Sequence, residues 1–421
     1  MDKRSFIKKA SLVGLALPFS FNALDELMSG VAGVSPKDLA KDDEFWLKIR
    51  SDYKIKPDYI NLENGYYAIL PEETLEHFIN HVREVNYQGS WYMRTVQWEN
   101  KKAIAAKLAK MAGCGADELV ITRNTTEALD LVISGLDWRE GDEAVMAEQD
   151  YGAMLNQFKL VGRRYGVKSK IVSIPNHPKS DDELVDLYAS AITSKTRLLM
   201  VCHLVNITGQ IMPVKKICEM AHSKGVEVMV DGAHAFAQID FSINDLDCDY
   251  YGTSLHKWLS VPLGAGFLYV NKSKVAGLWP LLAENDLPDD DIYRLNHTGT
   301  HPVHTDLAIS NAIDFHNRIG IERKEARLRF LQHYWTSKVR DLPRVIVNTP
   351  AEQHRHAAIG NVGIEGIEPS DLAKTLLEDY NIWTVAINRP GVRGLRITPG
   401  IFTTTAELDE LIRALKALSR L

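Results

Sequence analysis

The chain has few cysteines, and their spacing suits neither a metal site nor a disulfide framework. Its 421 residues include four cysteines, with no Cys-x-x-Cys pair among them. Cys114, Cys202, Cys218 and Cys248 each lie in or beside an apolar run, where a free thiol behaves as a small buried hydrophobe. The sequence therefore predicts no zinc or other metal site.

Runs of one charge, internal repeats and low-complexity tracts are also missing. The chain carries 49 Lys and Arg against 55 Asp and Glu, a formal net charge of −6. No basic stretch is interleaved with aromatic residues, so we expect no nucleic-acid partner. Apolar residues at 45% and charged residues at 25% are typical of a soluble globular protein. A chain of this length can hold two domains around sizeable cores.

Long apolar runs are scarce, and the clearest one lies near the N-terminus. Four basic residues among the first nine precede the apolar run Ala10–Phe21. This order is typical of an export signal, and the run is too short for a stable membrane span. KRSFIKK resembles the twin-arginine export motif, with Lys3 in place of the first arginine. We expect residues 1–35 to be an export signal and lead-in and the protein to be periplasmic. The alternative is an amphipathic N-terminal helix of a cytoplasmic protein.

The most informative stretch covers residues 226–270 and contains three short apolar runs. Val226–Val230, Tyr250–Thr253 and Gly266–Val270 are rich in β-branched or aromatic residues, which predicts three buried strands. Asp231 ends the first run, and Lys257 follows in a short loop after the second. The ends of strands are where open α/β sheets bind ligands.

A carboxylate and a lysine in this arrangement suit the chemistry of pyridoxal phosphate. The lysine would form a Schiff base with the cofactor, and the carboxylate would keep its pyridine nitrogen protonated. Taken alone, an Asp at a strand end is more often a cap, and a loop Lys is more often solvated surface. Ser254, His256 and the Gly-Ala-Gly run after Lys257 favour the functional interpretation.

The segments DGAHA, SLHKW and PLGAGFLYV resemble the class V aminotransferase family of fold-type I pyridoxal-phosphate enzymes. That family includes cysteine desulfurases and isopenicillin N epimerase-like proteins, and the resemblance runs from about Asn61 to the C-terminus. It implies an α/β fold with a mostly parallel seven-stranded sheet in a large domain, residues 60–295. A smaller α/β C-terminal domain would take residues 296–421 with part of 36–75. The resemblance also implies a homodimer.

The resemblance assigns Lys257 and Asp231 as catalytic residues and places others around the cofactor. At the phosphate, a strand runs into a helix N-terminus, which presents free N–H groups; an ordinary helix cap would use the same residues. An aromatic residue would stack on the ring, with a tyrosine that simply packs at a loop end as the alternative. The implied cofactor contacts are Thr125, Thr126, Tyr151, Asn206, Asp231, His234, Ser254, His256, Lys257 and, from the neighbouring subunit, Thr300.

Two residues are implied to contact the substrate. Asn64 lies in an N-terminal loop that covers the active site in the family. Arg396 matches the arginine that pairs bidentately with the substrate α-carboxylate, and Arg393 is a rival for that role.

These residues predict an enzyme that acts on an amino acid, most simply an aminotransferase. The alternative is an epimerase or lyase of the isopenicillin N epimerase-like kind. A protein that retains only the fold is a third possibility, but it would have no use for both Lys257 and Asp231. A cysteine desulfurase needs a mobile nucleophilic cysteine in the C-terminal part, and no cysteine follows Cys248.

Overall fold

The computed structural model describes residues 21–283 and 286–420. Most of the predicted export signal, including KRSFIKK, lies outside these residues, and export stays a prediction. Within the described ranges, no helix has both the length and the apolar character that crossing a bilayer requires.

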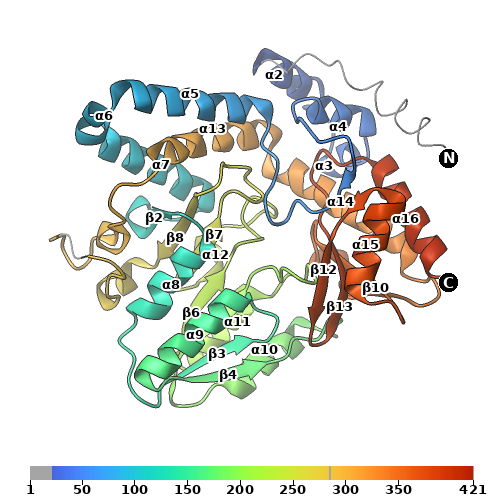
Figure 1. Cartoon of the computed structure of the whole chain (residues 1–421). Helices are drawn as coiled ribbons and strands as arrows, with labels where there is room; N and C mark the ends of the chain where they lie inside the picture. The colour runs from blue at the N-terminus through green and yellow to red at the C-terminus, as the bar shows by residue number, and fades with distance from the viewer. Residues whose placement is uncertain (1–20, 284–285, 421) are drawn as a thin grey trace.

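The larger part of the molecule is built on a seven-stranded sheet, as the sequence predicted (Figure 1). Five neighbouring strands run parallel, and one strand near the edge runs antiparallel to both of its neighbours. The strands, in sheet order, are β2 (Leu119–Thr122), β8 (Gly266–Val270), β7 (Tyr250–Ser254), β6 (Glu227–Asp231), β5 (Thr196–Cys202), β3 (Glu143–Ala147) and β4 (Lys168–Val172). The three strands predicted between residues 226 and 270 form, each within one residue of the expected bounds.

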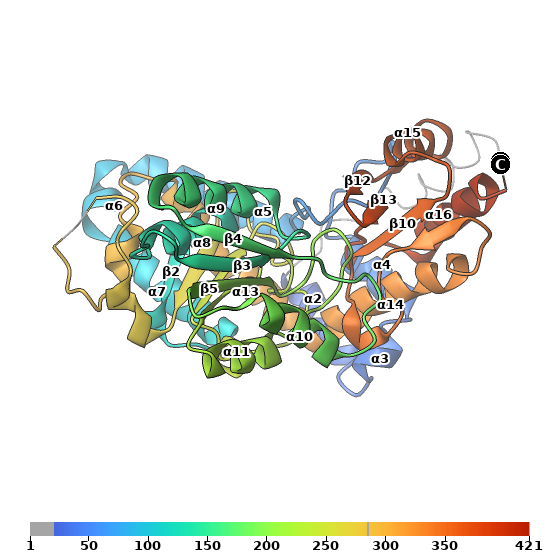
Figure 2. The same ribbon diagram turned by 90° about the horizontal axis from the view of Figure 1, so that it is seen from below.

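Both faces of this sheet are covered by helices, which explains why its strands read as continuous apolar runs. In β3, Ala144 and Met146 pack toward α8 and α9, whereas Val145 and Ala147 pack into the core on the opposite face. Figure 2 shows α8 and α9 on one side of the sheet and α10 and α11 on the other. These helices are α8 (Thr125–Gly135), α9 (Gly152–Tyr165), α10 (Asp181–Ala191), α11 (Val214–Ser223) and the short α12 (Ile243–Leu246).

Three successive helices, rather than one long helix, follow residue 71. Gly89 separates the first two helices with a positive φ of 58°, and Val96 ends the second helix. The third ends at Gly113, a left-handed C-cap. The N-terminal helices are α2 (Phe21–Gly30), α3 (Pro36–Leu39), α4 (Asp43–Arg50), α5 (Glu72–Gln88), α6 (Ser90–Thr95) and α7 (Gln97–Ala112).

A second, smaller sheet of four antiparallel strands organises the C-terminal part, and its core is separate from that of the large sheet. The N-terminal segment returns to this part, because β1 (Ile60–Asn61) pairs with β11 (Ile382–Trp383). The four strands are β12 (Val385–Arg389), β13 (Val392–Ile397), β10 (Gly360–Ile364) and β9 (Val345–Val347), and the helices around them are α14 (Ile321–Val339), α15 (Pro369–Tyr380) and α16 (Thr405–Leu418). The predicted division of the chain at residue 296 stays a prediction, and α13 (Val303–Ile319), which follows it, packs against α5 and α7.

The joint between α13 and α14 holds a buried amine. Lys324, in the first turns of α14, donates a hydrogen bond to the carbonyl oxygen of Trp258, the residue that follows Lys257. Burial lowers the pKa of Lys324 to about 7. The beginning of α14 is thereby tied to the loop that carries the predicted catalytic lysine.

Lys324→Met should flatten the dependence of stability on pH. Above about pH 7 the folded protein holds this amine neutral, whereas the unfolded chain keeps it protonated up to the ordinary lysine pKa of 10.5. Unfolding therefore takes up a proton, and this group makes the wild type more stable as pH rises from 7 toward 10. Between these two pKa values, the free energy of unfolding of the wild type should rise with pH more steeply than that of Lys324→Met, by at most about 1.4 kcal/mol per pH unit.

Urea unfolding of both proteins between pH 7.5 and 9.5 measures these slopes. Lys338→Met is the matched control, because Lys338 lies on the same helix but is 40% exposed. Equal slopes for the wild type and Lys324→Met would show that Lys324 is not neutral in the folded protein.

Candidate active site

The site lies along the edge of the large sheet where the parallel strands end, and Lys257 is at its centre. The Lys257 amine lies 3.1 Å from Nε2 of His234, which is itself buried. Burial lowers the pKa of Lys257 to about 8, and Asp231 opposes that shift. A lysine tuned in this way has a substantial uncharged fraction near neutral pH, which a nucleophile or base requires.

The hydrogen bonds of His234 indicate which partner carries the proton. The indole N–H of Trp258 can only donate, and it points at Nδ1 of His234 at 3.4 Å. Nδ1 is therefore the acceptor, so Nε2 of the neutral ring carries the hydrogen and donates it to Lys257. Burial also lowers the pKa of His234 well below its usual range, which keeps the ring neutral. This hydrogen bond stabilises the uncharged form of the Lys257 amine.

Asp231 occupies the last position of β6 and is buried. Burial raises its pKa, while the backbone N–H of Ala233, 3.0 Å from Oδ1, and the nearby Lys257 oppose the rise. A carboxylate with a raised pKa is incompletely compensated by the charges around it. A protonated pyridine nitrogen would supply the missing positive partner.

The N-terminus of α8 and the end of β7 meet at one place. The backbone N–H of Thr125 donates to Oγ of Ser254 at 2.9 Å, and the two hydroxyls lie 2.7 Å apart. Thr126 lies half-buried in the same first turn. Nδ1 of His256 is buried, with no hydrogen-bond partner among the described residues. Helix N–H groups, two hydroxyls and an unpartnered imidazole nitrogen are suitable donors for a phosphate.

Two glycines allow β7 and β8 to approach this helix closely. A Cβ on Gly266 would lie 2.7 Å from Cα of Asn124, the N-cap of α8. A Cβ on Gly252 would lie 2.7 Å from the side chain of Leu129. The start of α8 can therefore approach the strand ends only if these positions carry no side chain.

The other predicted cofactor contacts are Tyr151, Asn206 and Thr300, and they differ in how exposed they are. Tyr151 follows β3 at the same edge of the sheet and is 47% exposed, so its ring is open to contact. Asn206 follows β5 and is half-buried. Thr300 is exposed in the loop before α13, and its predicted reach to a neighbouring subunit stays a prediction.

The two candidate arginines lie on opposite faces of β13, as expected for residues three apart on a strand. Arg393 is 57% exposed and pairs with Glu368 at 2.5 Å. Arg396 is buried and lies 3.5 Å from the carbonyl oxygen of Asn206, which places it beside the site. Of the two, only Arg396 is positioned to meet a substrate there.

Asn64 is placed to hold the N-terminal loop. Its side-chain amide donates to the carbonyl oxygen of Thr398 at 3.0 Å, and the residue is 1% exposed. The substrate contact predicted for it stays a prediction.

Reasoning from the sequence missed two buried carboxylates near the site. Glu63 pairs with Arg396, although 333 residues separate them in the chain. Asp150 precedes Tyr151, and burial raises its pKa to about 7. The pairing of Glu63 depends on the segment after β1 lying beside β13, which local sequence patterns do not reveal.

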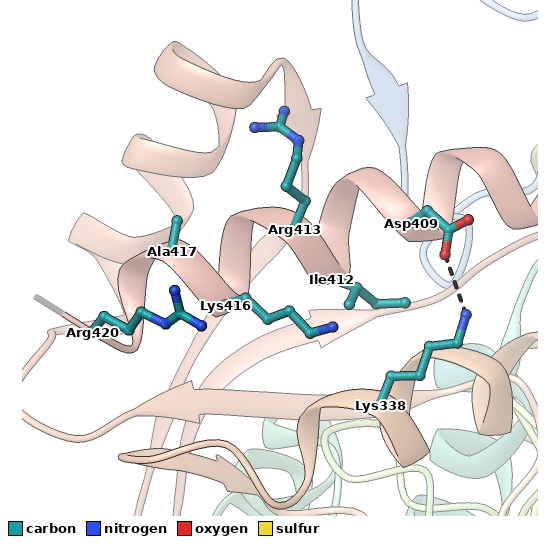
Figure 3. Close-up of a pocket in the computed structure, with 7 residues that line it drawn as sticks. All are labelled: Lys338, Asp409, Ile412, Arg413, Lys416, Ala417 and Arg420. Carbon is teal, nitrogen blue, oxygen red and sulfur yellow. Dashed lines mark hydrogen bonds and ion pairs between the residues drawn. The ribbon is translucent and has the colours of Figure 1, made fainter.

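A separate surface hollow of about 540 Å³ lies between α14 and α16 (Figure 3). Lys338 on α14 bonds to Asp409 across it, and the residues along its rim are largely basic. None of the predicted site residues lines this hollow, so we do not assign the chemistry to it.

The fold and the site define a fold-type I pyridoxal-phosphate enzyme. The sequence pattern of the Aminotransferase class-V family matches residues 68–410, so the chain belongs to this family. Isopenicillin N epimerases of Streptomyces clavuligerus and Amycolatopsis lactamdurans are 27% and 28% identical to it, over 89% of this chain and 98% and 99% of theirs. The apo structure of a cysteine desulfurase from Thermococcus onnurineus NA1 has the same fold, with a TM-score of 0.78 at 20% identity, covering 89% of this chain and 98% of that one.

Pyridoxal phosphate is the cofactor of this family, and the residues present fit it. The unpartnered Nδ1 of His256 and the donors around Thr125 and Ser254 suit the phosphate, and Asp231 lacks a full counter-ion. Thr125, Ser254 and His256 would hold the phosphate and Asp231 the pyridine nitrogen, and Lys257 stays the predicted point of covalent attachment.

Asp231→Asn should keep the cofactor and lose most of the turnover. The amide is nearly isosteric, so the phosphate contacts are unaffected, but it cannot stabilise a protonated pyridine nitrogen. We expect turnover to fall by about 100-fold or more, with cofactor content near one per chain. Asp150→Asn removes the neighbouring buried carboxylate and should have a much smaller effect. Comparable turnover of Asp231→Asn and wild type would place the role of Asp231 elsewhere.

Proposed function

We propose that this pyridoxal-phosphate-dependent enzyme is an aminotransferase acting on an amino acid. The observation that carries the proposal is the Lys257 amine, which lies 3.1 Å from Nε2 of His234 and whose pKa is lowered to about 8 by burial against the opposing charge of Asp231. Bound pyridoxal phosphate supplies an electron-accepting ring that stabilises negative charge at the substrate Cα. The residues of the chain must then attach the cofactor, orient the substrate and move a proton.

Lys257 is suited to move that proton. As a free amine it accepts the proton from the substrate Cα, and as an ammonium it returns it at a second carbon. A pKa near 8 allows both directions near neutral pH, because neither form is strongly favoured. His234 holds the amine in place through the 3.1 Å contact.

The similarity to isopenicillin N epimerases supports epimerisation as a second candidate. The two reactions share the first proton transfer and differ in where the proton returns. If the proton returns to Cα from the opposite face, the amino acid is inverted. If it is delivered instead to a carbon of the cofactor, the reaction is a transamination. Geometry around the substrate decides between them.

Cysteine desulfurase chemistry is disfavoured. It requires an accessible thiolate, and the four cysteines are three buried residues and the half-buried Cys114. Burial raises the pKa of the Cys114 thiol to about 12, and it also raises the pKa values of the other three thiols. Such thiols are poor nucleophiles at neutral pH.

Two measurements test the proposal. Wild-type protein with pyridoxal phosphate should be yellow and carry a borohydride-reducible link on Lys257, and Lys257→Ala should lose that link by mass spectrometry. Lys324→Met, which alters a second buried lysine, should keep the covalent link.

Incubation of the loaded wild type with a panel of amino acids, without a keto acid, should then convert bound cofactor to pyridoxamine phosphate.

The outcomes separate the alternatives. Solvent deuterium at Cα with inversion, and no pyridoxamine phosphate, would favour the epimerase. A colourless wild type that takes up no cofactor would contradict the whole proposal.

We also propose that the active unit is a homodimer. Several aromatic side chains near the α5–α6–α7 turns are exposed, with Tyr87 at 87%, Trp91 at 60% and Trp98 at 51%. Large exposed aromatics gathered in one segment are typical of a protein–protein interface. A neighbouring subunit there would also explain the predicted role of Thr300.

Sedimentation should show a dimer at micromolar concentration. Trp91→Glu should raise the fraction of monomer, because it places a charge in an apolar interface. Trp279→Glu, which alters an equally exposed tryptophan at 64% in another segment, is the control. A fully active monomeric wild type would contradict this prediction.

A further inference from the structure

The guanidinium predicted to bind a substrate carboxylate already holds one from the protein itself. Arg396 meets Glu63 through two contacts, Nη2 to Oε1 at 2.5 Å and Nε to Oε2 at 3.1 Å. The two side chains are 9% and 4% exposed. This is the bidentate arrangement that an α-carboxylate would otherwise make.

Glu63 is held firmly in this position. The backbone N–H of Tyr66 donates to Oε1 at 3.0 Å, and the hydroxyl of Thr398 lies 3.4 Å from Oε2. The backbone of Glu63 also bridges to Thr398 beside the end of β13. Displacing this carboxylate would break several hydrogen bonds and leave a buried charge without its partner, which is strongly unfavourable.

The remaining donors of Arg396 face a weaker acceptor. Nη1 lies 3.5 Å from the carbonyl oxygen of Asn206, a long contact. A substrate could therefore approach this edge of the guanidinium while Glu63 stays bound. The substrate would meet an ion pair whose charges largely cancel. The electrostatic contribution to carboxylate binding would therefore be much smaller there than at an unpaired arginine.

We infer that Glu63 is a specificity-determining residue that weakens the preference of the site for an α-carboxylate. This inference rests on the proposed function and narrows its substrate class. Amino compounds whose carboxyl group is absent, or masked as an amide, should compete well with free amino acids.

The test compares Glu63→Gln with a matched control at the other arginine of β13. Glu63→Gln removes the charge and keeps the shape, so Arg396 becomes available to an external carboxylate. Glu368→Gln makes the same change in the Arg393 pair, whose members are 57% and 56% exposed. Titration calorimetry of the holoenzyme with acetate, and with acetamide as the uncharged probe, reports carboxylate binding without any turnover.

We expect Glu63→Gln to bind acetate about 10-fold or more tightly than the wild type, with acetamide unchanged. The ratio of kcat/KM for alanine against ethylamine, and for phenylalanine against phenethylamine, should rise by a similar factor. Glu368→Gln should change neither quantity by more than about twofold. If Glu63→Gln folds poorly, Glu63→Asp, whose shorter carboxylate cannot span both contacts as well, should give a smaller shift in the same direction.

Unchanged acetate affinity and unchanged ratios in a folded, cofactor-loaded Glu63→Gln would overturn the inference. That result is distinct from failure of the proposed function, in which the wild type would take up no pyridoxal phosphate. A wild type that prefers alanine over ethylamine as strongly as Glu63→Gln does would also overturn it.

Discussion

The function of the site depends on the protonation of the Lys257 amine, which is half-buried, lies 3.1 Å from Nε2 of His234 and is affected by the charge of Asp231. Burial disfavours the ammonium, whereas Asp231 favours it. The carboxylate compensates only in part, because burial is the larger of the two effects. The balance places the pKa of the amine at about 8, in the range that proton transfer near neutral pH requires.

The parallel sheet makes this balance possible. β6 and β7 run in the same direction, so Asp231 and Ser254 end at one edge of the sheet. The antiparallel β8 returns Gly266 to the same edge, where a residue without a side chain admits the N-terminus of α8. Asp231 and Ser254 are thus fixed by the backbone hydrogen bonds of the sheet, and His256 and Lys257 lie in the short turn that follows β7 directly.

The sequence was most informative where function depends on short segments. Asp231, Ser254, His256 and Lys257 lie within 27 residues, and their strands could be recognised from apolar runs. The pairs that complete the site join distant segments: Glu63 with Arg396, and Lys324 with Trp258. Each of these two pairs depends on how α14 or β13 packs against the rest of the chain, and a local sequence pattern does not predict that packing. The choice between Arg393 and Arg396 likewise required knowing which face of β13 is covered.

The Glu63–Arg396 pair also bears on the lysine itself. Arg396 acts to lower the pKa of Lys257, and Glu63 acts to raise it. An unpaired guanidinium beside the amine would therefore favour the free base further, and would make the ammonium needed for returning the proton harder to form. The bound carboxylate offsets this effect while leaving part of the arginine open to a ligand. One buried pair can in this way influence both which substrates enter and how readily the lysine changes its protonation state.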